Sequence, residues 1–448
     1  MGSTYRAAGG CWRPSTKEGH VGTTLVQRVA AASSSRDRVL DAAKTLALVV
    51  VVVGHSLAWH ITPAITAANV LESERWLVPL TWVFQVLPIF FAAGAVSNAA
   101  SLRRHGAREY LLRRSRGLAT PVLIYAALWT VVLLPFGGMS QQVVGAGRFL
   151  SQLLWFAGVY LLVSSAAPVT ARWAARRPLL VLGVWLLLIA GVDAVRWSGG
   201  PSWVGWVNLL LVWGWLHQLG YCIPVLRRRA GDGPAARAAL ALGAAALLAA
   251  AVALALFGPY SSSLVTIGGD SELSNLSPPT LVLALYGAGQ VLLLVVLWPA
   301  LAAFLSDDRR WAVVALVGAR GIGIYLWHIP LVGCAAAIAL LVGWVVVPLS
   351  PWWWVVHLLV VVVVLPLAWL IAGVAASVGR RLDRVPRLLP LPAAVAAVGA
   401  GLVVLNISVT GFATWAGSGM LGLWSSSLLN LVLLLLCWQA VGQVEADA

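Results

Sequence analysis

The chain has 448 residues, of which 60% are hydrophobic and only 10% are charged, and its net charge is +15. A soluble domain is roughly 45–50% apolar and about 25% charged, so this composition excludes a soluble globular enzyme and a disordered chain. Short alternating strands are not evident in the sequence, which argues against an outer-membrane barrel. The composition predicts an all-α, polytopic membrane protein built from helices of about 20 residues.

The first segment, residues 1–36, is polar, small and basic. It lacks the continuous apolar run and the small-residue cleavage site of a signal peptide. We therefore expect residues 1–36 to form a disordered cytoplasmic tail.

The rest of the chain contains about twelve apolar segments of membrane-spanning length. They lie at about 40–60, 78–99, 119–136, 149–169, 179–195, 203–222, 238–257, 280–304, 319–344, 353–376, 391–411 and 420–441. Arginine clusters follow every second segment, beginning at Arg103, Arg172, Arg227, Arg309 and Arg380.

This alternation is the positive-inside pattern, and it predicts a multi-pass plasma-membrane protein with both termini in the cytoplasm. It also explains the positive charge without a nucleic-acid partner. The four cysteines are scattered and have no Cys/His ligand spacing, so we expect neither disulfides nor a metal site. The oligomeric state is left open.

Ionisable residues at helix depth are the most informative, because each is costly in hydrocarbon and must face a cavity or a partner. In the first span, Lys44 and His55 are eleven residues apart, which is about three helical turns, so both lie on one face. Asp41 lies on nearly the same stripe. An interfacial salt bridge and a hydrogen-bonded packing histidine are the alternative interpretations.

A second group of basic residues, Arg113, Arg114 and Arg116, begins the third span. These arginines act as topology determinants, and they are also suited to grip the phosphates of an anionic substrate. Buried polar residues elsewhere are His217, Tyr325 and His328. Each either satisfies neighbouring backbone groups or contributes to binding an acceptor.

These motifs together resemble the integral-membrane acyltransferases known as acyltransferase family three, in an actinobacterial-type branch. The resemblance runs from about Arg36 to Gly343. It is carried by Asp41, Lys44 and His55 in the first span, Pro88–Gly94 in the second, Arg113–Pro121, Leu154–Phe156 and Tyr325–Pro330. Two positions depart from the usual pattern, with Lys44 in place of arginine and Ala93 in place of serine.

The resemblance implies a ten-helix acyltransferase core, here residues 37–388, followed by about two additional transmembrane helices in residues 389–448. It implies transfer of an acyl group other than an amino-acyl group, commonly acetyl, from cytoplasmic acyl-CoA to a hydroxyl. The acceptor would be a carbohydrate of a surface polysaccharide, a glycolipid or a related small molecule. Acyl-CoA is then a co-substrate, and no bound cofactor is expected.

Acyl transfer from a thioester to an alcohol needs a base and stabilisation of the oxyanion. We assign the base to His55, which either deprotonates the acceptor or briefly carries the acyl group. Lys44, oriented by Asp41, would bind acyl-CoA at the cytoplasmic mouth together with Arg113, Arg114 and Arg116, and the acceptor-binding candidates are Tyr325, His328 and His217. The alternatives are a secondary transporter or exporter, against which the lack of internal repeats counts, and a non-catalytic scaffold.

Overall fold

The computed structural model describes residues 25–33, 36–61, 67–265, 275–344, 346–386 and 389–441. Nearly all of the described chain is helical, which confirms the predicted all-α polytopic class. The helices are α1 (Leu25–Ala32), α2 (Arg38–Ala58), α3 (Val70–Ser73), α4 (Leu80–Phe84), α5 (Leu87–Leu133), α6 (Gln141–Ser151), α7 (Leu154–Ser165), α8 (Ala167–Arg176), α9 (Pro178–Trp197), α10 (Val207–Gly220), α11 (Ile223–Gly231), α12 (Pro234–Phe257), α13 (Leu281–Phe304), α14 (Asp308–Gly318), α15 (Gly321–Leu341), α16 (Pro351–Leu382), α17 (Ala393–Thr410) and α18 (Ser427–Ala440).

Strands occur only as two short antiparallel pairs within the described residues, β1 (Trp59–Ile61) with β2 (Ala67–Asn69), and β3 (Gly417–Ser418) with β4 (Trp424–Ser425). Single 3-10 turns complete the chain at η1 (Arg75–Leu77), η2 (Leu134–Phe136), η3 (Ser202–Trp206) and η4 (Met420–Gly422). Each pair of strands closes a connection between two helices, so the strands contribute no layer of their own.

Each predicted span overlaps a helix, the last of them only over Ser427–Ala440. By length and composition, 8 helices of the described chain are able to cross a membrane, or up to 10 if each bent pair of helices is one span. Two of the predicted spans are not counted separately among these helices. One lies in the second half of α5, which is counted as one helix although it is broken at Gly106, and the other is α18, which has only 14 residues. Gly106 has φ +71°, a conformation that glycine adopts without the steric cost of a Cβ.

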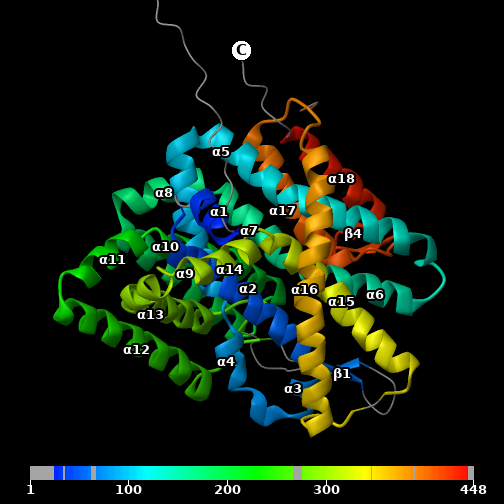
Figure 1. The fold of residues 1–448 in the computed structure, drawn as a ribbon, viewed down its shortest axis with the longest axis horizontal. Coiled ribbons are helices and arrows are strands. Elements are labelled where there is room, and N and C mark those ends of the chain that lie inside the picture. The colour runs from blue at the N-terminus through cyan, green and yellow to red at the C-terminus, as the bar shows by residue number, and fades with distance from the viewer. Residues whose placement is uncertain are drawn as a thin grey trace, which may run out of the picture.

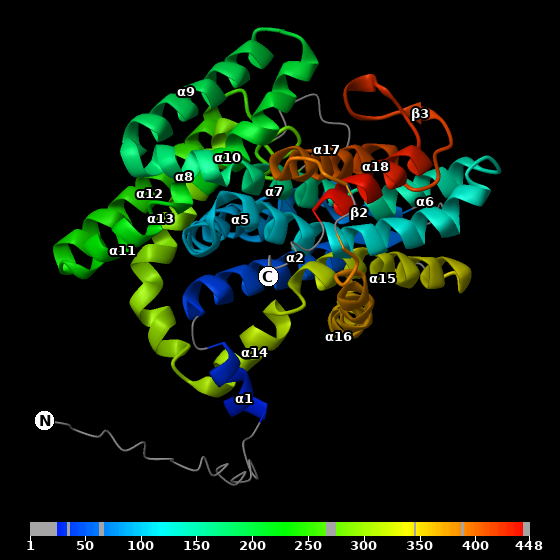
Figure 2. The ribbon, with the colours of Figure 1, turned by 90° about the horizontal axis from the view of Figure 1, so that it is seen from above.

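The helices form one bundle whose middle is occupied by α2, α5 and α7. Figure 1 shows α12 and α13 side by side at one edge, with α17 and α18 gathered on the other side of the bundle. Within each pair, the two helices are in direct contact. In the view from above, α15 and α16 cover the bundle next to α2, and α9 lies at the far edge (Figure 2). The large apolar core therefore surrounds α2, α5 and α7.

Hydrogen bonds place several arginine-bearing junctions at the same end of the bundle. Arg38, at the start of α2, donates to the carbonyl of Leu305 and to Asp308, each at 2.8 Å, and so joins α2 to the junction of α13 and α14. Arg227 of α11 donates to Asp37 at 3.3 Å. Asp37 also caps α2 by accepting from two backbone amides of its first turn. We call this the arginine-rich end.

At the opposite end, Asp193 of α9 holds three elements together. Its carboxylate accepts from the backbone amide of Leu281 at 2.7 Å, from Asn208 at 2.9 Å and from Tyr260 at 3.3 Å. Asp193 is buried, with 2% of its surface exposed. It therefore caps α13 and fixes the described part of the connection between α12 and α13, of which residues 266–274 lie outside the described residues.

The expected disordered tail falls largely outside the described residues, which begin at Leu25. Its described part differs from the expectation, because Leu25–Ala32 form α1. This helix packs on α14, and the indole nitrogen of Trp311 donates to the Ser33 hydroxyl at 2.8 Å. Burial of Trp311 against this segment provides the tertiary contact that composition does not indicate.

Candidate active site

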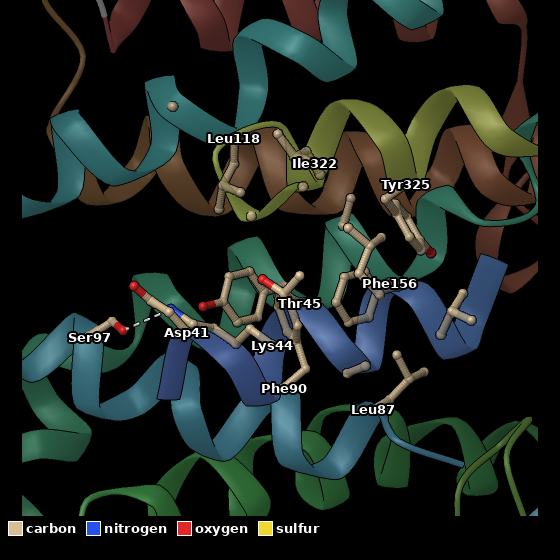
Figure 3. A pocket seen from close by; sticks show the side chains of 18 of the residues that line it. Asp41, Lys44, Thr45, Leu87, Phe90, Ser97, Leu118, Phe156, Ile322 and Tyr325 are labelled. Atoms are coloured by element: carbon tan, nitrogen blue, oxygen red, sulfur yellow. Dashed lines mark hydrogen bonds and ion pairs between the residues drawn. The ribbon is translucent and has the colours of Figure 1, made fainter. Parts of the chain in front are cut away.

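The predicted polar stripe on α2 is present and is held by charge pairs. Lys44 Nζ lies 2.7 Å from Asp41 Oδ1, and Arg36 Nε lies 2.5 Å from Asp41 Oδ2. Lys44 also donates to the hydroxyl of Ser97 on α5 at 3.3 Å (Figure 3). The Lys44 side chain is 23% exposed, so its ammonium is oriented by two partners and still reaches open space.

Two of the predicted arginines on α5, Arg113 and Arg114, face the same space. Arg114 donates to the Tyr160 hydroxyl of α7, and its guanidinium carbon lies 5.0 Å from the centre of the Tyr160 ring. Arg113 pairs with Glu109 one turn earlier, at 2.6 Å, and is largely exposed. Arg114 is thus a fixed cation, whereas Arg113 is a solvated one.

These charged residues open into a cavity of about 320 Å³. It lies between α2, α5, α7 and the junction of α14 with α15. Figure 3 shows Asp41, Lys44 and Ser97 towards one end and Leu87 and Tyr325 towards the other. The wall between them is apolar, and it includes Leu48, Val51, Phe90, Leu118, Phe156 and Ile322. The cavity therefore has a charged mouth and an apolar interior.

His55 lies one turn beyond Val51, a residue of the cavity wall, and is paired with a second histidine. Its Nδ1 is 2.9 Å from Nε2 of His328, and the two rings are nearly parallel, at 8°. Nδ1 of His328 is 3.2 Å from the carbonyl oxygen of Ile324, which only accepts. A neutral His328 therefore carries its proton on Nδ1 and accepts from His55, which leaves His55 Nε2 unprotonated and free to take a proton.

Tyr325 lies on the same helix as His328, and its ring forms part of the cavity wall. The phenol donates to the carbonyl of Leu153 at 2.7 Å. This bond fixes the ring beside His328, with a distance of 5.9 Å between ring centres. Of the three acceptor candidates, Tyr325 lines the deep end of the cavity, and His328 lies beside it behind the cavity wall.

A family model described as an acyltransferase domain matches residues 37–373. The chain belongs to acyltransferase family three. No curated protein and no solved structure matches it. The protein is accordingly a multi-pass membrane acyltransferase, and the matched region begins at the predicted start of the core and ends within α16.

One predicted donor-binding residue of the acyltransferase lies elsewhere. Arg116 is 7% exposed and is not part of the cavity wall. Its guanidinium donates to Asp383 at 3.1 Å and to the carbonyl of Leu382 at 2.7 Å, and it lies 4.6 Å from the centre of the Trp438 ring. Arg116 therefore ties α5 to the end of α16 and to α18.

His217 is also separate from the cavity. It is buried on α10, with its Nε2 3.0 Å from the amide nitrogen of Asn98, and that amide also donates to Ser164 at 3.2 Å. This cluster fastens α5 to α7 and α10. The alternative stated for His217, a satisfied polar group in the bundle, describes its surroundings better than contact with an acceptor.

The two helices that follow the matched region are packed into the acyltransferase core. A Cβ atom on Gly158 of α7 would lie 2.7 Å from the backbone nitrogen of Leu405, so glycine is needed there for the close approach of α17. Trp438 of α18 donates to Thr120 of α5 at 2.9 Å. The predicted additional helices thus share a core with the family fold.

Sequence reasoning missed the partners that orient the basic residues. Ser97 and Tyr160 come from α5 and α7, and each touches a cation from another helix. Gly94 makes room for Tyr160, because a Cβ atom at Gly94 would collide with the tyrosine ring. The glycine of the second-helix motif was the one available signal, since a glycine inside a helix often marks a close approach.

Proposed function

We propose that this acyltransferase moves an acyl group, most simply acetyl, from cytoplasmic acyl-CoA to a hydroxyl of a carbohydrate or glycolipid. The observation that carries the proposal is one cavity with Lys44, Arg113 and Arg114 at its mouth and the His55–His328 pair one turn past its wall. Clustered arginines orient a membrane protein towards the cytoplasm, so the mouth would face the compartment that holds acyl-CoA. The membrane would be the plasma membrane, with both termini inside.

The dimensions of α2 suit the donor. Eleven residues separate Lys44 from His55, which is a rise of about 16 Å at 1.5 Å per residue. An extended pantetheine arm has a similar length, so a thioester beside His55 places the diphosphate near Lys44. There, Arg114 and Arg113 provide charge-assisted hydrogen bonds to phosphate oxygens. The apolar wall excludes water from the thioester.

The histidine pair supplies the base. Nε2 of His55 takes the proton from the acceptor hydroxyl as its oxygen attacks the thioester carbonyl. The new C–O bond forms, the C–S bond breaks, and the proton passes from His55 to the leaving thiolate of CoA. The same Nε2 could instead attack first and carry the acyl group, with the acceptor attacking in a second step. His328 holds the proton on Nδ1 of His55 in either route, which keeps Nε2 available.

The acceptor would enter from the opposite end of the bundle. Tyr325 lines the apolar end of the cavity, and His328, which pairs with His55, lies beside it. The phenol oxygen of Tyr325 keeps acceptor capacity after donating to Leu153, so it is suited to receive a hydrogen bond from a second hydroxyl of a sugar.

The test does not need the acceptor to be known. Membranes of cells lacking the gene, complemented with the wild-type chain, are incubated with [¹⁴C]acetyl-CoA, and alkali-labile label in lipid and glycan fractions is counted. We expect label with the wild type and a loss of about 10²–10⁴ with His55→Ala at matched expression. His105→Ala, on the arginine-rich end, is the control and should label normally. Near-normal labelling by His55→Ala, or none by the wild type, contradicts the proposal.

A further inference from the structure

A second hollow of about 260 Å³ lies beside the cavity mouth, at the arginine-rich end. It is formed by Asp37 just before α2, Leu40 of α2, Val96 of α5, Arg227 and Arg228 of α11, and Trp298 of α13. It lies outside the transfer site described above and contains two cations, one carboxylate and an apolar floor.

The second hollow and the main cavity are neighbours across two helices. Arg36 and Asp41, at the start of α2, line the main cavity, whereas Asp37 and Leu40 from the same stretch line the second hollow. On α5, the consecutive residues Ser97 and Val96 do the same. A ligand whose phosphates lie at Lys44 therefore has this hollow within reach when it leaves the cavity.

The chemistry of the hollow suits a nucleotide. Arg227 lies over the buried Trp298 ring, at 4.8 Å from its centre, and donates to Asp37 at 3.3 Å. Its guanidinium plane is thus held from two sides, and such a plane is a stacking surface for a base. Arg228 is exposed beside it, with its positive charge available to a phosphate.

The position along α2 matches the remaining part of the donor. Seven residues separate Asp37 from Lys44, which is a rise of about 10 Å. In CoA, the 3′-phosphorylated adenosine follows the diphosphate on the side away from the thioester. If the diphosphate lies at Lys44, the adenosine must lie at the level of Asp37.

We propose that the second hollow binds the 3′-phosphoadenosine end of acyl-CoA, with the adenine stacked on Arg227 and the 3′-phosphate bound by Arg228. This inference rests on the proposed donor. An anionic lipid headgroup would also attract Arg228, but it has no base to use the stacking plane on Arg227.

The test compares CoA with 3′-dephospho-CoA, which lacks only the phosphate assigned to Arg228. Equilibrium binding of both is measured by calorimetry on the purified full chain in uncharged detergent. We expect the wild type to bind CoA about tenfold more tightly at low salt, since a charge-assisted phosphate contact is lost in the analogue. In Arg228→Gln the two affinities should become equal. Arg229→Gln, the neighbouring exposed arginine outside the hollow, should keep the wild-type ratio.

The outcomes separate the two proposals. If the wild type binds CoA and dephospho-CoA equally, or if Arg228→Gln keeps the preference, the second hollow is not the 3′-phosphate site, while CoA remains the donor. If the wild type binds neither compound, the proposed donor itself is wrong. Repeating the titration in nanodiscs with and without anionic lipid tests the other occupant. A nucleotide site keeps its preference for CoA over dephospho-CoA in nanodiscs without anionic lipid. If Arg228→Gln changes CoA binding only when anionic lipid is present, the hollow binds lipid headgroups and the assignment is overturned.

Discussion

Replacing Arg116 with alanine should destabilise the protein and leave donor binding intact. The side chain makes hydrogen bonds to Asp383, Leu382 and Val385 and lies over the Trp438 ring. Three hydrogen bonds at roughly 0.5–1.5 kcal/mol each and one cation–π contact of about 0.5–1 kcal/mol give a loss of about 2–5.5 kcal/mol. The lower half of that range is expected, because the Asp383 side chain is 45% exposed and water replaces part of what it loses.

The assay is thermal unfolding of the purified chain, followed by tryptophan fluorescence, together with calorimetric binding of CoA. A loss of this size lowers the Tm by on the order of 5 °C. The CoA affinity of Arg116→Ala should stay within about twofold of the wild type, since Arg116 does not line the cavity. Arg114→Ala should weaken CoA binding, and Arg108→Ala, an exposed neighbour on α5, should change neither quantity. An unchanged Tm with weakened CoA binding in Arg116→Ala would return this arginine to the donor site and refute the reasoning.

Three further changes probe other contacts. Gly94→Ala should force Tyr160 aside at a cost of about 1–3 kcal/mol in stability. Because Tyr160 holds Arg114, the same change should weaken CoA binding in calorimetry. Unchanged affinity would show that Tyr160 does not position the cation. His328→Phe keeps a ring but removes the hydrogen-bond acceptor for His55. Acetyl transfer should therefore fall about 10²-fold while the CoA affinity is retained. Full activity would count against a role for the histidine pair. Asp193→Ala, at the end of the bundle opposite the arginine-rich end, removes the acceptor of three hydrogen bonds. It should lower the Tm by several degrees and leave CoA binding normal. A normal Tm would contradict the capping role of Asp193.

The sequence by itself determined the membrane class, the positions of the spans and the stripe on α2. Lipid leaves backbone polar groups no partner but a helix, so apolar length alone located the long helices. A helix also repeats every 3.6 residues, so the spacing of Asp41, Lys44 and His55 was enough to place them on one face. These are local properties, and local patterns reveal them.

Only the tertiary structure decided which polar residues meet. Arg114 and Arg116 are two residues apart and look equivalent as charges, yet one faces the cavity beside Tyr160 and the other is bound by Asp383, 267 residues later. The partner of His55 comes from α15, 273 residues away, and its tautomer depends on the backbone carbonyl of Ile324. Such pairings depend on how helices distant in sequence pack together, and helical periodicity carries no information about that.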